Sequence, residues 1–121
     1  MIPKFRAWDK ELKMMCDVLK IDFGNGTLFY RHWLYGVSRE IDLNEVIVIQ
    51  STNLKDKNDV EIYEGDMVEN SYKEIGFIKN CNDAFCFNRK ERNFYLSGIG
   101  AGSPFKILGN IYENPELLED N

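Results

Sequence analysis

The chain has 121 residues, a formal net charge of −5 and hydrophobic residues at 44% of its positions. This length fits one domain of ordinary size, and the hydrophobic content excludes a wholly disordered chain. The acidic balance disfavours a general nucleic-acid coat protein, because such proteins need clustered lysine and arginine to release counterions.

The ends of the chain and its cysteines point to one compartment. The N-terminal residues carry no apolar run of the secretory-signal kind, and the longest uncharged apolar run, Val46–Ile49, is far too short for a membrane span. The cysteines, Cys16, Cys81 and Cys86, are odd in number and lack the paired spacing of a zinc site. We therefore expect reduced thiols in a cytoplasmic protein with no metal, no cofactor and no membrane association.

Apolar and polar residues alternate along most of the chain, which is typical of β-strands. A first strand is predicted at Phe5–Trp8, turning at Asp9-Lys10. A hairpin follows, with strands at 14–23 and 27–37 joined by a Gly-Asn-Gly turn. Residues 38–45 fit either a loop or a weak strand. Further strands are predicted at 46–52, 60–63, 67–68, 74–79, 84–88 and 105–112.

Turn-forming residues divide the second half of the chain. Residues 53–59 form a charged, turn-rich segment, which could separate two lobes, 1–52 and 53–121, of a single domain spanning 1–121. A glycine-rich loop is predicted at 98–104, and Asn114–Leu118 has the cap and first-turn residues of a short helix. The predicted class is mostly β (β-rich α+β), with small antiparallel barrel-like or meander sheets and a short C-terminal helix.

No stretch carries a catalytic or metal-binding signature. The glycines of the 98–104 loop precede no helix that could receive a pyrophosphate, and Asp56–Asp59 fails the spacing of a calcium loop. Glu64 and Asp66 flank a glycine and fit a turn, and nothing in the sequence marks either as buried. His32 could activate a cysteine only if the fold brings them together. We therefore expect no catalytic residues, and we lean against an enzyme.

An aromatic segment is the first candidate binding surface. In a strand over 27–37, Arg31, Trp33 and Tyr35 would face the same side. Tryptophan, tyrosine and arginine are enriched at protein-binding hot spots. Burial of both strand faces in the protein's own core is the competing and favoured interpretation.

A basic segment is the second candidate. Arg89, Lys90 and Arg92 precede Phe94 and Tyr95, and this mixture could hold phosphates and stack bases of a single-stranded nucleic acid. A solvated hairpin loop is the competing interpretation, which the acidic balance of the chain favours.

Three segments together carry a family resemblance. They are Lys4–Asp9 (KFRAWD), Leu54–Val68 (LKDKNDVEIYEGDMV) and Ile107–Leu118 (ILGNIYENPELL). In this order they resemble the phage and prophage proteins of the YopX type. Asn53 and Asp59 stand where that family usually has glycine, so the local turns could be built differently.

The resemblance implies a phage or prophage origin, a bacterial host and a mostly-β fold, but no particular activity. With the aromatic segment, it favours a non-enzymatic accessory protein that binds a protein partner or its own copies. The alternative is a protein that binds single-stranded nucleic acid through Arg89, Lys90, Arg92 and Tyr95.

Overall fold

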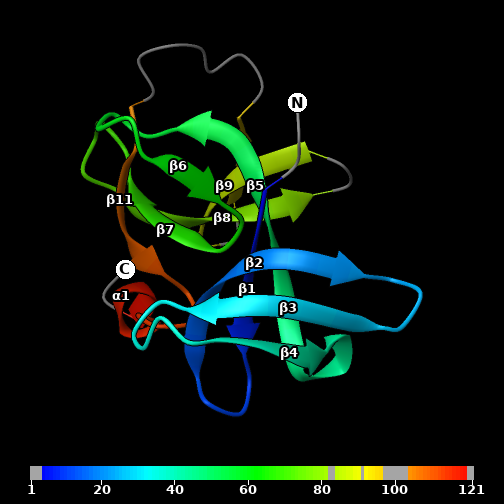
Figure 1. Cartoon of the computed structure of the whole chain (residues 1–121). Helices are drawn as coiled ribbons and strands as arrows, with labels where there is room; N and C mark the ends of the chain where they lie inside the picture. Colours follow the sequence, from blue (N-terminus) through cyan, green and yellow to red (C-terminus); the bar gives the residue numbers. More distant parts are fainter. Residues whose placement is uncertain (1–3, 82–83, 91, 97–103, 120–121) are drawn as a thin grey trace. The chain divides into compact units, whose positions relative to one another are not determined.

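The computed structural model describes residues 4–81, 84–90, 92–96 and 104–119, and most of them lie in β-strands (Figure 1). The chain divides into two compact units, Met1–Gln50 and Ser51–Asn121. The predicted mostly-β class is confirmed. Within the described ranges, no helix is both long and apolar enough to cross a membrane.

The N-terminal unit is an antiparallel meander. Its elements are β1 (Phe5–Asp9), β2 (Met14–Asp22), β3 (Thr27–His32), β4 (Ser38–Asp42), the 3-10 helix η1 (Leu43–Glu45) and the first half of β5 (Val46–Lys55). The strands lie in the order β4-β3-β2-β1-β5. Short turns explain why β1 to β4 lie side by side in chain order, because each turn places the next strand beside the previous one.

One core cluster holds this unit together. Alternate residues of a strand share a face, and the register sets Ala7 beside Cys16 and Leu28 beside Ile41. The cluster consists of Ala7, Cys16, Leu28, Tyr30, Ile41 and Val46. Because it contains a tyrosine, it also buries a hydroxyl group that needs a hydrogen-bond partner.

The C-terminal unit contains the second half of β5, paired with β6 (Glu61–Tyr63), and an antiparallel sheet. The sheet's described strands are β7 (Asp66–Glu69), β8 (Ile75–Cys81), β9 (Ala84–Arg89), β10 (Arg92–Tyr95) and β11 (Lys106–Asn110), in the order β10-β9-β8-β7-β11. A single helical turn, α1 (Glu116–Glu119), follows. The core cluster consists of Ile62, Val68, Ile78, Phe87, Leu96 and Phe105.

Both sheets are open: β1 to β4 and β7 to β10 form meanders, and β5 and β11 lie beside β1 and β7. In the described part of the chain, the first and last strands of each sheet order do not pair, so no closed barrel forms. Of the two arrangements predicted, the meander is therefore right and the barrel-like one is wrong. The predicted loop at 98–104 lies outside the described residues, except for Pro104.

Two strands differ from their predicted lengths. β3 ends at His32 rather than at residue 37, because the chain reverses through a turn at Gly36, where φ is 66°. β5 continues to Lys55 instead of stopping at residue 52. Its pairing with β6 is interrupted by a register shift between Ser51 and Leu54 and then resumes.

The two positions that depart from the family pattern keep a left-handed backbone. Asn53 has a φ of 64° and Asp59 a φ of 66°. Glycine adopts this conformation freely, and asparagine and aspartate tolerate it better than other residues. Both positions therefore retain the backbone conformation that a glycine would supply.

Asp56 organises the turn between β5 and β6. Its Oδ1 accepts hydrogen bonds from the backbone N–H groups of Asn58 at 2.8 Å and Val60 at 2.9 Å. Its Oδ2 accepts one from the N–H of Ile107 in β11 at 3.1 Å. Within this charged, turn-rich segment the Asp56 carboxylate is therefore buried, and it joins the turn to the sheet.

Candidate functional site

The turn between β3 and β4 presents large apolar side chains to solvent. The N–H of His32 donates to the carbonyl of Val37 at 3.1 Å, and the N–H of Gly36 donates to the carbonyl of His32 at 2.9 Å. Between these bonds the exposed fractions are 44% for Trp33, 74% for Leu34, 67% for Tyr35 and 55% for Val37. Turns are usually polar, so this exposed apolar turn (residues 33–37) is a candidate contact surface.

Trp33 anchors the apolar turn to the sheet. Its indole N–H donates to Asp17 Oδ1 at 2.8 Å, and its backbone N–H donates to the carbonyl of Met15 at 3.1 Å. The Arg6 guanidinium carbon lies 4.8 Å from the centroid of the Trp33 ring, a cation–π distance. These contacts fix Trp33, so the turn, which continues through the more exposed Leu34 and Tyr35, is preorganised at its first residue.

Of the three residues predicted to share a strand face, only Arg31 lies in the strand. It is exposed on β3, opposite Asp17 on one side and Ser38 on the other. Trp33 and Tyr35 lie in the turn that follows. The sequence interpretation missed Leu34 and Val37 as members of the surface, although Gly36 inside the apparent strand was a signal for a turn.

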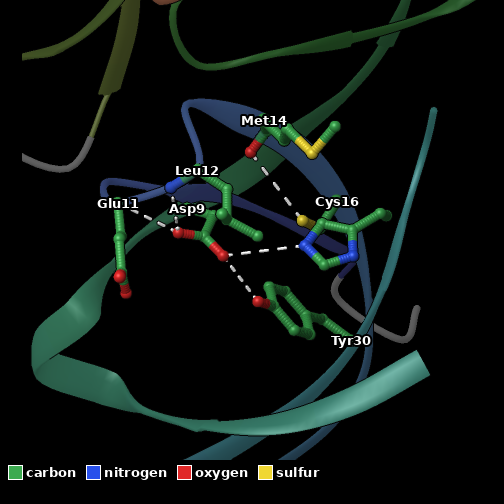
Figure 2. A network of polar contacts seen from close by, with 7 residues as sticks. Asp9, Glu11, Leu12, Met14, Cys16 and Tyr30 are labelled. Atoms are coloured by element: carbon green, nitrogen blue, oxygen red, sulfur yellow. Dashed lines mark hydrogen bonds and ion pairs between the residues drawn. The ribbon is translucent and has the colours of Figure 1, made fainter. Parts of the chain in front are cut away.

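A buried polar network around Asp9 and Tyr30 lies in the N-terminal unit (Figure 2). Asp9 is fully buried, and its Oδ1 accepts hydrogen bonds from the N–H groups of Glu11 and Leu12, each at 3.0 Å. The Tyr30 hydroxyl donates to Oδ2 at 2.6 Å, and His32 Nε2 lies 3.6 Å from the same oxygen. Burial raises the pKa of Asp9, but these donors outweigh burial, so its net pKa lies below the usual 3.8.

The structure brings His32 and Cys16 to paired positions of β3 and β2 but does not make a reactive pair of them. The Cys16 thiol donates to the carbonyl of Met14 at 3.7 Å. Burial and, next, the charge of Asp9 raise the pKa of Cys16 to about 12. The thiol therefore stays protonated at neutral pH, and its role here is packing.

The remaining cysteines belong to the C-terminal unit. Cys81 ends β8, and the buried Cys86 lies in β9. Burial and a hydrogen bond with Cys81 raise the pKa of Cys86 to about 11. Among the described residues, no group of three or more histidine, cysteine, aspartate or glutamate side chains could hold a metal ion.

The basic segment borders a hollow of about 580 Å³ in the C-terminal unit. The described residues that line this basic hollow are Glu74, Arg89, Lys90, Arg92 and Phe94. Arg89 Nη1 lies 3.5 Å from Glu74 Oε2, and Lys90, with a φ of 59°, turns the chain between β9 and β10. Three of the four predicted nucleic-acid contacts thus come together.

Tyr95, the fourth predicted contact, is exposed but does not line the basic hollow, because successive residues of β10 point to opposite faces. Phe94 lines it instead. Phe94 also borders an adjoining hollow of about 270 Å³, which we call the aromatic hollow. Its described lining residues are Asn70, Ser71, Tyr72, Glu74, Phe87, Phe94, Pro104 and Phe105.

The residues that carry the family resemblance hold turns together. Asp66, which is buried, accepts the N–H of Tyr63 at 2.8 Å. The Asn110 side-chain oxygen accepts the N–H groups of Tyr112 at 3.0 Å and Glu113 at 2.8 Å. With Asp9 and Asp56, these side chains accept backbone N–H groups of turns, so the shared motifs serve the fold.

Comparisons with known proteins agree with the resemblance. The family described as YopX protein matches residues 4–119. The crystal structure of protein EF1440 from Enterococcus faecalis is 31% identical, with a TM-score of 0.68, over 98% of this chain and 99% of that one. The structure of protein yopX from Bacillus subtilis, 18% identical, has a TM-score of 0.58 over 95% and 97% of the two chains. No curated protein matches the chain significantly.

Proposed function

The chain belongs to the YopX family, and we propose that it is a non-enzymatic binding module that docks on a protein partner through its apolar turn. We also propose that the chain originates from a phage or prophage and acts in the cytoplasm of a bacterial host. The sequence motifs of the YopX type support this part of the proposal. The observation that carries the proposal is the exposure of Leu34 and Tyr35 in the turn that begins at the anchored Trp33.

The geometry favours a partner that offers a groove. Trp33 is held by Asp17 and Arg6, so little conformational entropy would be lost when the turn is buried. A few anchoring aromatic and aliphatic side chains usually supply most of the binding free energy at such a contact. The turn therefore suits an apolar groove that receives Leu34 and Tyr35.

The charged residues around the turn indicate which charge the groove of the partner should carry. Arg31 on β3 and Arg39 on β4 are both exposed next to the turn, where the nearby carboxylate of Asp17 is already engaged by the Trp33 indole N–H. In a symmetric pair of identical chains these arginines would repeat on both sides of the contact, and like charges oppose association. We therefore propose a different protein as the partner, with carboxylates around an apolar groove.

Affinity capture with matched variants tests the proposal. The tagged chain is incubated with a lysate of the cells that encode it, treated with nuclease. Leu34→Ser/Tyr35→Ser is compared with Phe23→Ser, since Phe23 is equally apolar and exposed but lies in the turn between β2 and β3. The expected result is one stoichiometric protein that the wild type and Phe23→Ser retain and the double variant loses.

The captured protein is then purified and titrated against the chain. We expect Leu34→Ser/Tyr35→Ser to weaken binding more than about 30-fold, as for hot-spot side chains, and Arg31→Glu/Arg39→Glu to slow association. Equal binding by the wild type and the folded double variant would refute the proposal. A concentration-dependent dimer that the double variant abolishes would instead identify a second copy as the occupant.

A further inference from the structure

The basic hollow concentrates positive charge within an acidic unit. Residues 51–121 carry 8 Lys+Arg against 13 Asp+Glu, yet both arginines of this stretch and Lys90 line one hollow. The described carboxylate among its lining residues is Glu74. Such clustering against the overall charge is typical of a surface that receives an anion.

The pairing of β9 with β10 places like charges opposite each other. Arg92 lies directly across from Arg89 in the antiparallel register. Directly opposed like charges destabilise a sheet. In addition, Arg89 Nε is buried and has no hydrogen-bond partner. Glu74 Oε2, 3.5 Å from Arg89 Nη1, offsets part of this repulsion. An anion between the two guanidinium groups would relieve the rest, and arginine suits phosphate because its planar fork binds two oxygens.

An aromatic surface adjoins the cations on the same strands. Phe94 lies across from Phe87, with ring centroids 6.3 Å apart, and Phe87 lies 5.3 Å from Phe105. Phe94 is half exposed and borders both hollows, so one of its faces is open to a flat ligand. Aromatic side chains next to arginines are how proteins stack bases while they hold phosphates.

We propose that the basic and aromatic hollows together bind a nucleotide unit, with its phosphate on Arg89, Lys90 and Arg92 and its base on Phe94. The nucleotide unit could be part of a single strand of nucleic acid or a free nucleotide. This site uses none of the residues of the apolar turn, so it goes beyond the proposed protein-binding function, and either can fail alone.

Titration of the full chain with a short fluorescein-labelled oligothymidine, followed by fluorescence anisotropy, tests the site. With three phosphate-binding cations on a single strand, the affinity should fall about 20-fold between roughly 50 and 200 mM salt. Removing two of the cations in Lys90→Gln/Arg92→Gln should weaken binding at low salt and reduce that dependence to a few-fold. The matched control Lys57→Gln/Lys79→Gln removes two exposed charges of the same unit outside the hollow and should bind like wild type.

A second pair of variants separates stacking from charge. Phe94→Ala should weaken binding about tenfold, from the loss of one base–aromatic contact, whereas Tyr95→Ala, its neighbour on the opposite face, should not. Circular dichroism and thermal melting establish that each variant is folded. Lys90→Gln alone, a change at an exposed turn residue, serves if the double variant does not fold.

Competition with thymidine 5′-monophosphate distinguishes the two sources of the ligand. Displacement of the oligothymidine at a similar concentration of monophosphate would identify a free nucleotide, and displacement only at far higher concentration would identify a strand. Absence of binding for both probes at low salt would overturn the proposal, and so would equal binding by the folded hollow variants. The apolar-turn variant Leu34→Ser/Tyr35→Ser should bind oligothymidine like wild type.

Discussion

The hydroxyl of Tyr30 donates a 2.6 Å hydrogen bond to the carboxylate of Asp9, and both side chains are fully buried in the N-terminal unit. The bond joins β3 to the end of β1, two strands with β2 between them in the sheet. The bond gives the buried Tyr30 hydroxyl a hydrogen-bond partner, and it lowers the free-energy cost of burying the charged Asp9 carboxylate.

Tyr30→Phe should destabilise the protein by about 1.5–3 kcal/mol, the usual worth of a hydrogen bond to a charged group. Urea unfolding followed by circular dichroism measures the change. Tyr35→Phe removes a hydroxyl from an exposed ring and should change the free energy of unfolding by less than about 0.5 kcal/mol. Equal stability of wild type and Tyr30→Phe would contradict the assigned role of the bond.

Asp56 should make the stability depend on acid. Burial raises the pKa of Asp56, but the N–H groups of Val60, Ile107 and Asn58 outweigh burial, so its folded-state pKa lies below 3.8. A depressed folded pKa gives stability that is fully present above the unfolded pKa and is lost as the pH falls through the folded one. We therefore expect the free energy of unfolding to fall as the pH decreases below about 4.

Asp56→Asn tests this linkage. The amide keeps one acceptor oxygen but sets a second donor against a backbone N–H, so the variant should lose about 1–3 kcal/mol at neutral pH. It should also show a shallower loss of stability in acid, because the titrating group is gone. Urea unfolding at several pH values measures both effects, and a slope as steep as that of the wild type would argue against the assignment.

Gly65→Ala should cost about 1–3 kcal/mol. Gly65 has a φ of 86°, and a Cβ there would lie 2.9 Å from Cε2 of Tyr112. Asn53→Gly is the contrasting variant, because a left-handed backbone already exists at Asn53 and glycine accepts it. That change should alter the stability by less than about 1 kcal/mol. Thermal unfolding of both variants separates the two cases, and a neutral Gly65→Ala would show that Tyr112 can move aside.

Cys16 should resist thiol reagents in the folded protein. With a pKa of about 12 and full burial, it exposes almost no thiolate at pH 8, and the thiolate is the reacting species. Alkylation with iodoacetamide followed by mass spectrometry should label Cys81, which is partly exposed, well before Cys16 and the buried Cys86. In urea, all three should react at similar rates. Early labelling of Cys16 would show that the sheet opens locally.

Strand positions could be predicted from the sequence because apolar and polar residues alternate where one face of a strand is buried and the other is exposed. The end of β3 could not, since Trp33, Leu34 and Tyr35 continue the apolar composition of the strand into the turn. Gly36 was the local signal, and its left-handed backbone outweighs the strand preference of its aromatic neighbours. The candidate surface at Arg31, Trp33 and Tyr35 consequently stays a prediction, with a geometry different from the one expected.

The burial of three carboxylates could not be predicted from the sequence, for a different reason. Asp9, Asp56 and Asp66 are aspartates, a residue type that usually lies at the surface. Only the tertiary structure shows the backbone N–H groups from which these buried carboxylates accept hydrogen bonds. In the same way, the position of Phe94 at the basic hollow and of Tyr95 outside it depends on the register of β10. A one-residue shift would exchange them, and the sequence alone does not set that register.

The charged side chains of β4 protect the edge of the N-terminal sheet. This strand is the outer strand of the N-terminal meander, and its exposed side chains include Arg39, Glu40 and Asp42. Charged side chains on an outer strand discourage the pairing of that edge with another chain, which is the first step of β-aggregation. The charges of β4 thus allow the apolar turn beside it to remain exposed without recruiting the sheet into fibrils.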